Sequence, residues 1–186
     1  MKKLVYTGSG VALVTPMHKD GSINYEKFGE LIEFQISHGT DAIIACATTG
    51  ESPVLNHEEH CKALEYVIQK VNKRVPVIAS TGSNDTAYAV QLSQEAERMG
   101  ADALLSVTPY YNKTTQKGLV AHFTYVADRV NVPMIVYNVT LAGLVSYEML
   151  LRLGRIEGVE GIKYTSSTVF DIFRIKEALG QDFAVY

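Results

Sequence analysis

Short apolar runs alternate with longer amphipathic stretches along the whole chain. The short runs are rich in β-branched residues or almost wholly apolar, and this pattern predicts strands that are buried on both faces. Such strands are typical of a parallel sheet covered by helices. The predicted strands lie at residues 11–15, 41–47, 75–81, 101–107, 133–138, 158–164 and from residue 183 onward.

The amphipathic stretches between these runs carry apolar residues at helical spacing and have recognisable ends. Asn24 is a good N-cap for the first helix, and Gly39 can end it. Asn56 and Glu59 have the spacing of a capping box, which predicts the start of the second helix. Later helices are predicted at residues 86–99, 116–130 and 170–179, with a short helix after Ser146.

Strand and helix alternate about every thirty residues, which is the size of a βα unit. No linker rich in proline, glycine or serine interrupts the pattern, so we expect one α/β domain over residues 1–186. In a parallel (β/α) barrel the carboxyl ends of all strands share one rim, where active sites are built. Polar residues cluster at this end of the predicted strands, in the last strand residues or directly after them: Thr48, Thr49, Tyr110, Tyr111, Tyr137, Asn138, Lys163 and Thr165.

Lys163 is the most informative of these residues because it follows an apolar pair at the end of a predicted strand. Burial would lower the pKa of its amine, and a neutral amine can attack a carbonyl to form a Schiff base. Two plainer interpretations stay open: the lysine can extend into solvent, and a tyrosine can pack in the core with a wet hydroxyl. We favour catalysis because three tyrosines also fall at strand ends.

The composition is that of an ordinary soluble globular protein, with 47% hydrophobic and 20% charged residues among 186. A net charge of −3 without a basic run argues against nucleic acid as a partner. No segment approaches membrane-spanning length, and no signal-like apolar region follows the N-terminus, so we expect a cytoplasmic protein without a membrane partner. Cys46 is expected to be a small core residue, and Cys46 and Cys61 are expected to make no ligand cluster.

Five short motifs make the chain recognisable. They are Thr48-Thr49-Gly50-Glu51-Ser52, Leu55-Asn56-His57-Glu58-Glu59-His60, Thr108-Pro109-Tyr110-Tyr111-Asn112-Lys113, Tyr137-Asn138-Val139 and Gly161-Ile162-Lys163. In this order and spacing they resemble the class I pyruvate-dependent lyase and aldolase family typified by dihydrodipicolinate synthase (4-hydroxy-tetrahydrodipicolinate synthase). The double threonine and the Tyr-Tyr-Asn-Lys loop resemble the synthase more than its relative N-acetylneuraminate lyase.

The resemblance implies a role for each matched residue. Lys163 would form a Schiff base with pyruvate, and Tyr137 would shuttle protons beside it. Thr48 would link Tyr137 to Tyr111 in a hydroxyl relay, and Thr48 and Thr49 would hold the pyruvate carboxylate. The second substrate would be an aldehyde, the pathway lysine and diaminopimelate biosynthesis, and neither a metal nor an organic cofactor would be required.

The resemblance also implies an assembly. In the family the second tyrosine of the pair reaches across a dimer interface, so a homodimer or homotetramer is expected. A lysine-binding allosteric pocket is matched in part, by Ser52, His57, His60, Asn84 and Tyr110, whereas Tyr88 stands where an acidic residue is common.

Two departures from the family pattern affect the expected function. The family continues Tyr-Asn-Val with Pro-x-Arg-Thr-Gly, but Val139-Thr140-Leu141-Ala142-Gly143 contains no arginine to bind the aldehyde substrate's carboxylate. The family is also longer, so we expect a (β/α)8 barrel truncated after about seven strands, without the C-terminal helices. Self-association would then cover the open edges. The truncation and the missing arginine could reduce the activity. Two alternative functions stay open: a neuraminate-lyase-like or keto-sugar-acid aldolase, and an inactive pyruvate-binding protein.

Overall fold

The computed structural model describes residues 4–112, 114–138, 145–165 and 169–186. Within these residues seven strands form one sheet in chain order, and every neighbouring pair is parallel. The predicted strands are all present, although most are shorter than the apolar runs that indicated them. They are β1 (Gly10–Ala12), β2 (Ala42–Ala45), β3 (Val77–Ser80), β4 (Ala103–Val107), β5 (Met134–Asn138), β6 (Val159–Tyr164) and β7 (Ala184–Val185).

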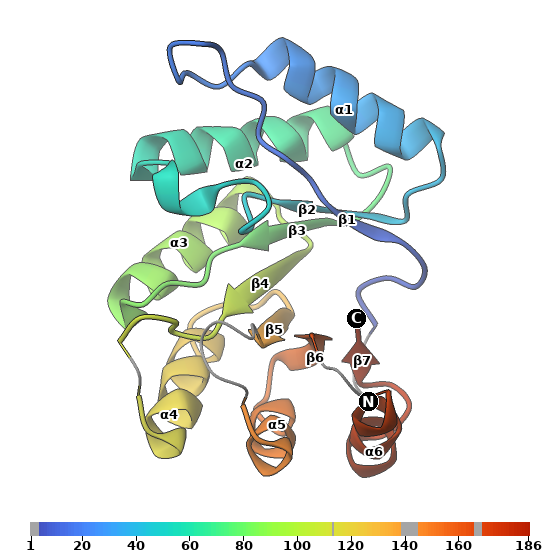
Figure 1. The fold of residues 1–186 in the computed structure, drawn as a ribbon, viewed down its shortest axis with the longest axis vertical. Helices are drawn as coiled ribbons and strands as arrows, with labels where there is room; N and C mark the ends of the chain where they lie inside the picture. The colour runs from blue at the N-terminus through green and yellow to red at the C-terminus, as the bar shows by residue number, and fades with distance from the viewer. Residues whose placement is uncertain (1–3, 113, 139–144, 166–168) are drawn as a thin grey trace.

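Helices lie along the outer side of the curved sheet (Figure 1). They are α1 (Tyr25–Ser37), the 3₁₀ turn η1 (Ser52–Val54), α2 (His57–Val71), α3 (Thr86–Met99), α4 (Gln116–Ala127), α5 (Tyr147–Gly154) and α6 (Phe170–Leu179). In this described part of the chain no helix combines the length and apolar character needed to cross a membrane. The predicted helices are confirmed, except that α4 ends at Ala127 instead of continuing to residue 130.

The predicted N-terminal signals of α1 and α2 are confirmed. The Asn24 side chain accepts a hydrogen bond from the Lys27 amide at the start of α1. Asn56 and Glu59 form both halves of the capping box of α2. Gly100 ends α3 with φ of 96°, a left-handed conformation that glycine adopts without strain. These local contacts place the first turn of each helix, and therefore the loop that precedes it.

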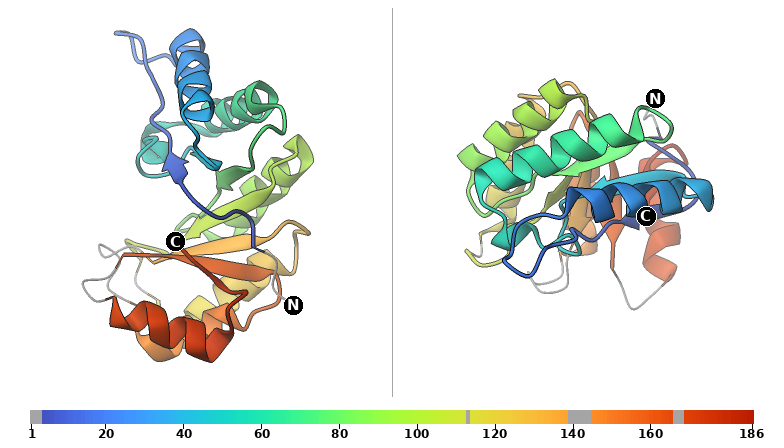
Figure 2. Two further views of the ribbon diagram at one scale, coloured as in Figure 1. Left: turned by 90° about the vertical axis from the view of Figure 1, so that its right-hand side faces the viewer. Right: turned by 90° about the horizontal axis from the view of Figure 1, so that it is seen from above.

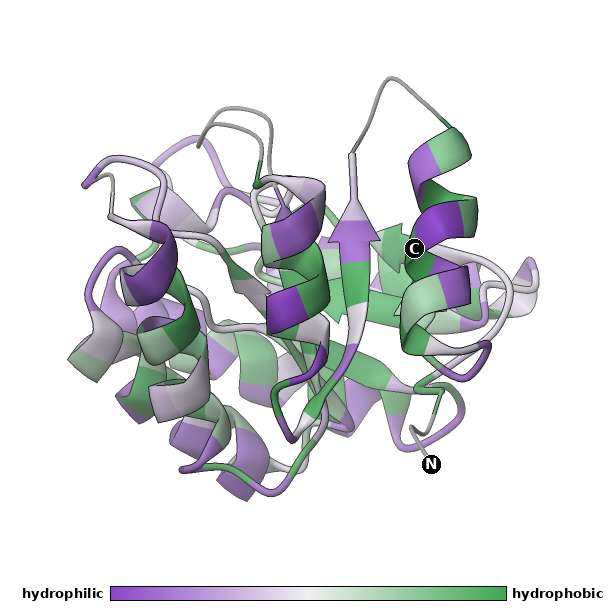
Figure 3. Cartoon of the chain, turned by 90° about the horizontal axis from the view of Figure 1, so that it is seen from below, coloured by the Kyte–Doolittle hydropathy of each residue, from purple (hydrophilic) through white to green (hydrophobic). Residues whose placement is uncertain are grey.

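The sheet has an apolar layer on each face. Helix and strand side chains such as Phe28, Leu64 and Phe123 fill the outer layer and are fully buried. The inner layer is smaller and contains Ala42, Ile44, Ala47, Ile78, Ala103, Leu105 and Ile135. Strands are predominantly hydrophobic in Figure 3, whereas hydrophobic and hydrophilic positions alternate around the helices. A sheet buried on both faces leaves its strand ends as the place where polar side chains gather.

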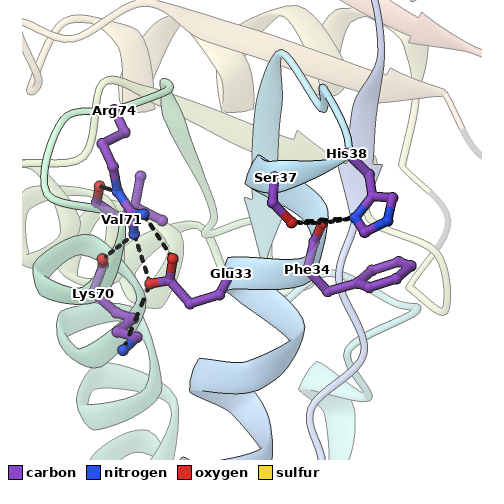
Figure 4. Close-up of polar contacts among 7 residues, drawn as sticks. All are labelled: Glu33, Phe34, Ser37, His38, Lys70, Val71 and Arg74. Carbon is purple, nitrogen blue, oxygen red and sulfur yellow. Dashed lines mark hydrogen bonds and ion pairs between the residues drawn. The ribbon is translucent and has the colours of Figure 1, made fainter.

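Helices α1 and α2 lie next to each other, as the view from above shows (Figure 2, right). Arg74, just after α2, donates from Nη1 and Nη2 to the Glu33 carboxylate of α1, at 2.7 and 2.8 Å (Figure 4). The hydrogen bond from Arg74 lowers the pKa of Glu33 to about 2. At the end of α1, Ser37 and His38 both contact the Phe34 carbonyl oxygen. Polar contacts thus fix the first two βα units side by side.

The two edges of the sheet are β1 and β7, which do not pair with each other in the described residues. The rings of Tyr6 and Tyr186 stack between them with centroids 4.4 Å apart. The Tyr186 hydroxyl also donates to the Tyr6 carbonyl oxygen at 3.2 Å. Side chains therefore bridge part of the opening, and the coverage of these edges by self-association stays a prediction.

Candidate active site

The ends of β5 and β6 bring Tyr137 and Lys163 together. The two residues are register partners, so their side chains leave the same face of the sheet. Lys163 Nζ lies 4.3 Å from the centroid of the Tyr137 ring. Lys163 is partly buried, and its burial lowers the pKa of the amine below the ordinary value of 10.5. A larger fraction of this amine is therefore neutral and nucleophilic than in a solvent-exposed lysine.

A cleft of about 340 Å³ opens beside Tyr137. Tyr137 lines it together with Thr48, from the loop after β2, and Val107, the register partner of Tyr137 on β4. From the predicted allosteric set, Ser52, His60 and Tyr110 line the same cleft. Of the other predicted residues, Lys163, Thr49, Tyr111, His57 and Asn84 are not part of this lining.

The threonine loop, residues 48–51, is held in a strained conformation. Glu51, its last residue, has φ of 59°, and Cys46, shortly before it, has φ of 52°, values that are uncommon for residues other than glycine. Gly50 packs tightly, because an added Cβ would lie 3.0 Å from the Leu13 carbonyl oxygen. Thr15, which is buried, donates its hydroxyl to the Gly50 carbonyl oxygen at 2.8 Å. Backbone strain of this kind often marks a functional loop, and here it leaves both threonines exposed.

Asn84 positions the tyrosine loop that follows β4. Its Oδ1 accepts hydrogen bonds from the amides of Tyr110, at 2.8 Å, and Tyr111, at 3.3 Å. Asn112 donates from Nδ2 to the Asn84 carbonyl oxygen at 2.9 Å. The family resemblance implies a possible allosteric role for Asn84, and the structure shows this positioning contact. The loop presents Tyr110 to the cleft and leaves Tyr111 88% exposed.

We expect Asn84→Ala to increase the hydrogen-exchange rate of the Tyr110 and Tyr111 amides. The substitution removes the oxygen that both amides share as acceptor. Each hydrogen bond contributes a net stabilisation of about 0.5–1.5 kcal/mol to the folded loop. Exchange measured by NMR on the labelled full chain checks this. Asn84→Asp is the matched control because it keeps an acceptor oxygen in place and should preserve the protection. Unchanged protection in Asn84→Ala would show that other contacts hold the loop.

The predicted hydroxyl relay is not assembled within one copy of the chain. Thr48 and Tyr137 share the cleft, but in the described residues no hydrogen bond joins Thr48 to Tyr137 or to Tyr111. The exposed position of Tyr111 is the one that a residue reaching toward another subunit would occupy. The relay stays a prediction.

The stretch 139–143, where the arginine is missing from the sequence, lies outside the described residues.

Two histidines of α2 have different environments. His60 is buried, and its Nε2 lies 2.9 Å from the Ser80 carbonyl oxygen. Burial lowers the pKa of His60, which favours a neutral ring that donates to that carbonyl. His57 is exposed, and its Nδ1 lies 3.2 Å from the hydroxyl of Tyr88, a residue of the cleft wall. His60 therefore supports the wall of the cleft, whereas His57 belongs to the outer surface.

The expectation that the cysteines make no ligand cluster stays a prediction, although Cys61 lies beside two other groups of a type that can bind a metal. Cys46 is buried as predicted, but Cys61 Sγ donates to Glu95 Oε2 at 3.1 Å and lies 3.8 Å from His57 Nε2. Potential metal ligands of the three residues all lie within 4.8 Å of one another. The sequence indicates two of the three residues, because His57 and Cys61 are four residues apart on a predicted helix and therefore lie on the same helix face. Burial, followed by the hydrogen bond to Glu95, raises the pKa of the Cys61 thiol to about 12.

Comparison with known proteins gives one consistent family. The family model described as "Dihydrodipicolinate synthetase family" matches residues 5–186. A protein named 4-hydroxy-tetrahydrodipicolinate synthase from Acetivibrio thermocellus is 50% identical over 188 residues, which include 100% of this chain and 63% of the relative. The chain thus spans less than two thirds of the length of such relatives.

Solved structures agree with the sequence comparison. The chloride-inhibited dihydrodipicolinate synthase from Acinetobacter baumannii, complexed with pyruvate, has a TM-score of 0.91 and 43% identity, covering 96% of this chain and 62% of that one. A synthase from Cyanidioschyzon merolae with lysine bound has a TM-score of 0.93 and 32% identity, covering 99% and 64%. The predicted fold class, seven strands of a (β/α) barrel, is therefore confirmed.

Proposed function

The chain belongs to the dihydrodipicolinate synthetase family, and we propose that it forms a Schiff base with pyruvate and condenses it with an aldehyde. The reaction would be like that of 4-hydroxy-tetrahydrodipicolinate synthase, in lysine and diaminopimelate biosynthesis. The observation that carries the proposal is the pair of Lys163 and Tyr137, in register at the ends of β6 and β5 with Nζ 4.3 Å from the ring centroid. A partly buried amine next to a phenol provides both a nucleophile and a proton carrier.

The proposed steps begin with the neutral amine of Lys163. Its nitrogen attacks the ketone carbon of pyruvate, and after proton transfer the carbonyl oxygen leaves as water. The resulting protonated imine withdraws electrons, so that the pyruvate methyl group loses a proton and becomes an enamine. The enamine carbon then bonds to the aldehyde carbon, and water releases the product and restores the amine. The Tyr137 hydroxyl would give and take the protons that imine formation requires.

The threonine loop is the proposed site for the pyruvate carboxylate. Thr48 lines the cleft with Tyr137, and the neighbouring Thr49 is exposed at the same loop. Hydroxyl and amide groups of a strained loop are preorganised, so they can bind a carboxylate with little rearrangement. The buried bond from Thr15 to Gly50 supports this role by fixing the loop from beneath.

We also propose that the active form is a homodimer or homotetramer. Tyr111 is 88% exposed although it belongs to a loop that Asn84 holds in place. An ordered and exposed aromatic ring is suited to an interface between subunits. In the assembly Tyr111 would approach the Thr48 of a partner copy and complete the hydroxyl relay. Sedimentation across a concentration range would detect this association.

A second candidate function is a retro-aldolase acting on sialic acids or keto-sugar acids. The sequence favours it at one point, because residues 139–143 carry no arginine to pair with a carboxylate on the second substrate. Both enzyme functions use the same imine, whereas a degenerate pyruvate-binding protein would form none. A panel of aldehydes and keto-acid cleavage substrates would distinguish the two enzymes.

The test of the proposed function is reductive trapping. We expect borohydride reduction with pyruvate to add mass to the peptide that contains Lys163, and reduction without pyruvate to add none. The peptide containing Lys62 is an internal control, because that lysine is exposed and paired with Glu58 at 2.6 Å. Equal labelling of both peptides, or no adduct at Lys163, would contradict the proposal.

A further inference from the structure

A cluster of three potential metal ligands lies between α2 and α3, separate from the lysine at the end of β6. His57 and Cys61 are one turn apart on α2, and Glu95 comes from α3. His57 Nε2 lies 3.4 Å from Glu95 Oε2, and Cys61 Sγ lies 3.1 Å from the same oxygen. The third separation, from Cys61 Sγ to His57 Nε2, is 3.8 Å. Cys61 Sγ also lies 4.0 Å from His57 Nδ1, so the sulfur lies beside the imidazole ring and close to both of its nitrogens. One nitrogen, one sulfur and one oxygen thus lie close together.

These separations match the geometry of a tetrahedral zinc site. With ordinary zinc bond lengths and tetrahedral angles, nitrogen and oxygen ligands stand about 3.4 Å apart, and sulfur stands about 3.6 Å from either. The observed distances of 3.4, 3.8 and 3.1 Å differ from those values by no more than roughly 0.5 Å. The sulfur lies almost as close to Nδ1 as to Nε2, so the His57 ring has to turn before the Nε2 lone pair and the sulfur can share one ion. The turn of one ring is the main rearrangement that binding an ion requires.

Hydrogen-bond partners of His57 and Glu95 occupy the other polar atom of each side chain and leave His57 Nε2 and Glu95 Oε2 available to an ion. The Tyr88 hydroxyl lies 3.2 Å from His57 Nδ1, so a proton on Nδ1 can be donated to the phenol oxygen. That tautomer leaves the lone pair of Nε2 free for an ion. Gln91 donates from Nε2 to Glu95 Oε1 at 3.2 Å, and the other carboxylate oxygen, Oε2, is the one that lies near Cys61 and His57. Partners of this kind orient the ligands in protein metal sites.

We propose that His57 Nε2, Cys61 Sγ and Glu95 Oε2 bind one Zn²⁺ ion, with a water molecule as the fourth ligand. On binding, the S–H bond of Cys61 breaks, its proton passes to solvent, and a Zn–S bond forms. The thiolate and the carboxylate together neutralise the two positive charges of the ion. A sulfur and an imidazole ligand select zinc over magnesium and calcium, which prefer oxygen.

The site has two consequences for the surrounding structure. The ion would join α2 to α3, and because it binds only the folded chain it would raise the melting temperature. It would also fix His57 against Tyr88, which lines the cleft. The ion takes no part in the proposed imine chemistry, so this inference does not depend on the proposed function.

Without a metal, the same three groups would form only a hydrogen-bonded surface network. The side chain of His57 is 43% exposed and that of Glu95 is 22% exposed, so solvent can reach the cluster in either case. Added zinc would not bind to a hydrogen-bonded network or stabilise it, whereas a metal site binds zinc with a defined stoichiometry. The two interpretations therefore differ in direct binding measurements.

The experiment uses the full chain without an affinity tag, reduced and stripped of metal with a chelator. Zn²⁺ is titrated by calorimetry, and Co²⁺ by absorption spectroscopy. We expect one ion per chain, tetrahedral cobalt bands with thiolate-to-cobalt charge transfer, and a melting temperature that rises with zinc. Binding of zinc with no stoichiometric end point, or a cobalt spectrum without charge transfer, would overturn the proposal.

Four substitutions define the ligands. Cys61→Ser and Glu95→Gln should each weaken zinc binding by more than the roughly 10- to 100-fold that loss of an outer partner costs. Tyr88→Phe should weaken it within that smaller range. The control His38→Gln removes an exposed imidazole on α1's end and should leave the affinity unchanged. Having two ligand variants guards against one that misfolds, which circular dichroism would reveal. Equal affinity in Cys61→Ser, Glu95→Gln and the unsubstituted chain would refute the site.

Discussion

Replacing Lys163 with methionine should abolish the pyruvate adduct and raise the melting temperature at neutral pH. Methionine keeps an unbranched chain of similar length but has no amine, so no imine can form. The gain in stability follows from burial, which lowers the pKa of the Lys163 amine in the folded state below its ordinary value of 10.5. A charged group that is partly desolvated opposes folding, and the substitution removes it.

The pH dependence gives this prediction a definite sign. Well below the folded-state pKa the amine is protonated in both states, and the folded chain carries the full cost of burying the charge. As pH rises through the folded pKa toward 10.5, the folded chain releases its proton first and its stability increases. The difference in melting temperature between the variant and the unsubstituted chain should therefore shrink over that window.

Two measurements on each protein check the result: the mass of the chain after reduction with pyruvate, and thermal unfolding at neutral and alkaline pH. Lys62→Met is the control, because that exposed lysine is paired with Glu58 on the same helix. It should leave the adduct intact and should not raise the melting temperature. A pyruvate adduct in Lys163→Met as strong as in the unsubstituted chain would show that another lysine carries the chemistry.

Substituting Tyr137 with phenylalanine should slow imine formation by about 10²- to 10⁴-fold, the contribution typical of one positioned acid or base. The change removes only the hydroxyl and keeps the ring whose face lies 4.3 Å from Lys163 Nζ. Packing should therefore be preserved, and the melting temperature should change little. The rate is measured by quenching the reaction with borohydride at successive times and counting adducts by mass spectrometry.

Tyr110→Phe is the matched control for this experiment, because Tyr110 lines the same cleft and no proton-transfer role is proposed for it. It should form the imine at close to the original rate. A comparable slowing in both variants would assign the effect to the cleft as a whole. A drop in stability of Tyr137→Phe large enough to explain the rate would indicate a tyrosine that serves packing instead.

Local patterns in the sequence were sufficient to predict the order of strands and helices. The capping box of Asn56 and Glu59 formed as predicted because both residues lie within one helical turn. Lys163 is predicted at a strand end because an apolar pair, Gly161 and Ile162, directly precedes it. These features depend on neighbours a few residues away, and such interactions are encoded by spacing along the chain.

The side-chain contacts of the candidate sites were decided by the tertiary structure. Asn84 meets the Tyr110 amide across 26 residues, and Cys61 meets Glu95 across 34. The strand ends brought Tyr137 and Lys163 together only through the register of β5 and β6, which includes a shift between Met134 and Ile135. Strand register and helix packing result from the fit of whole apolar faces. The partners of a polar residue at the edge of such a face therefore cannot be read from its own surroundings in the sequence.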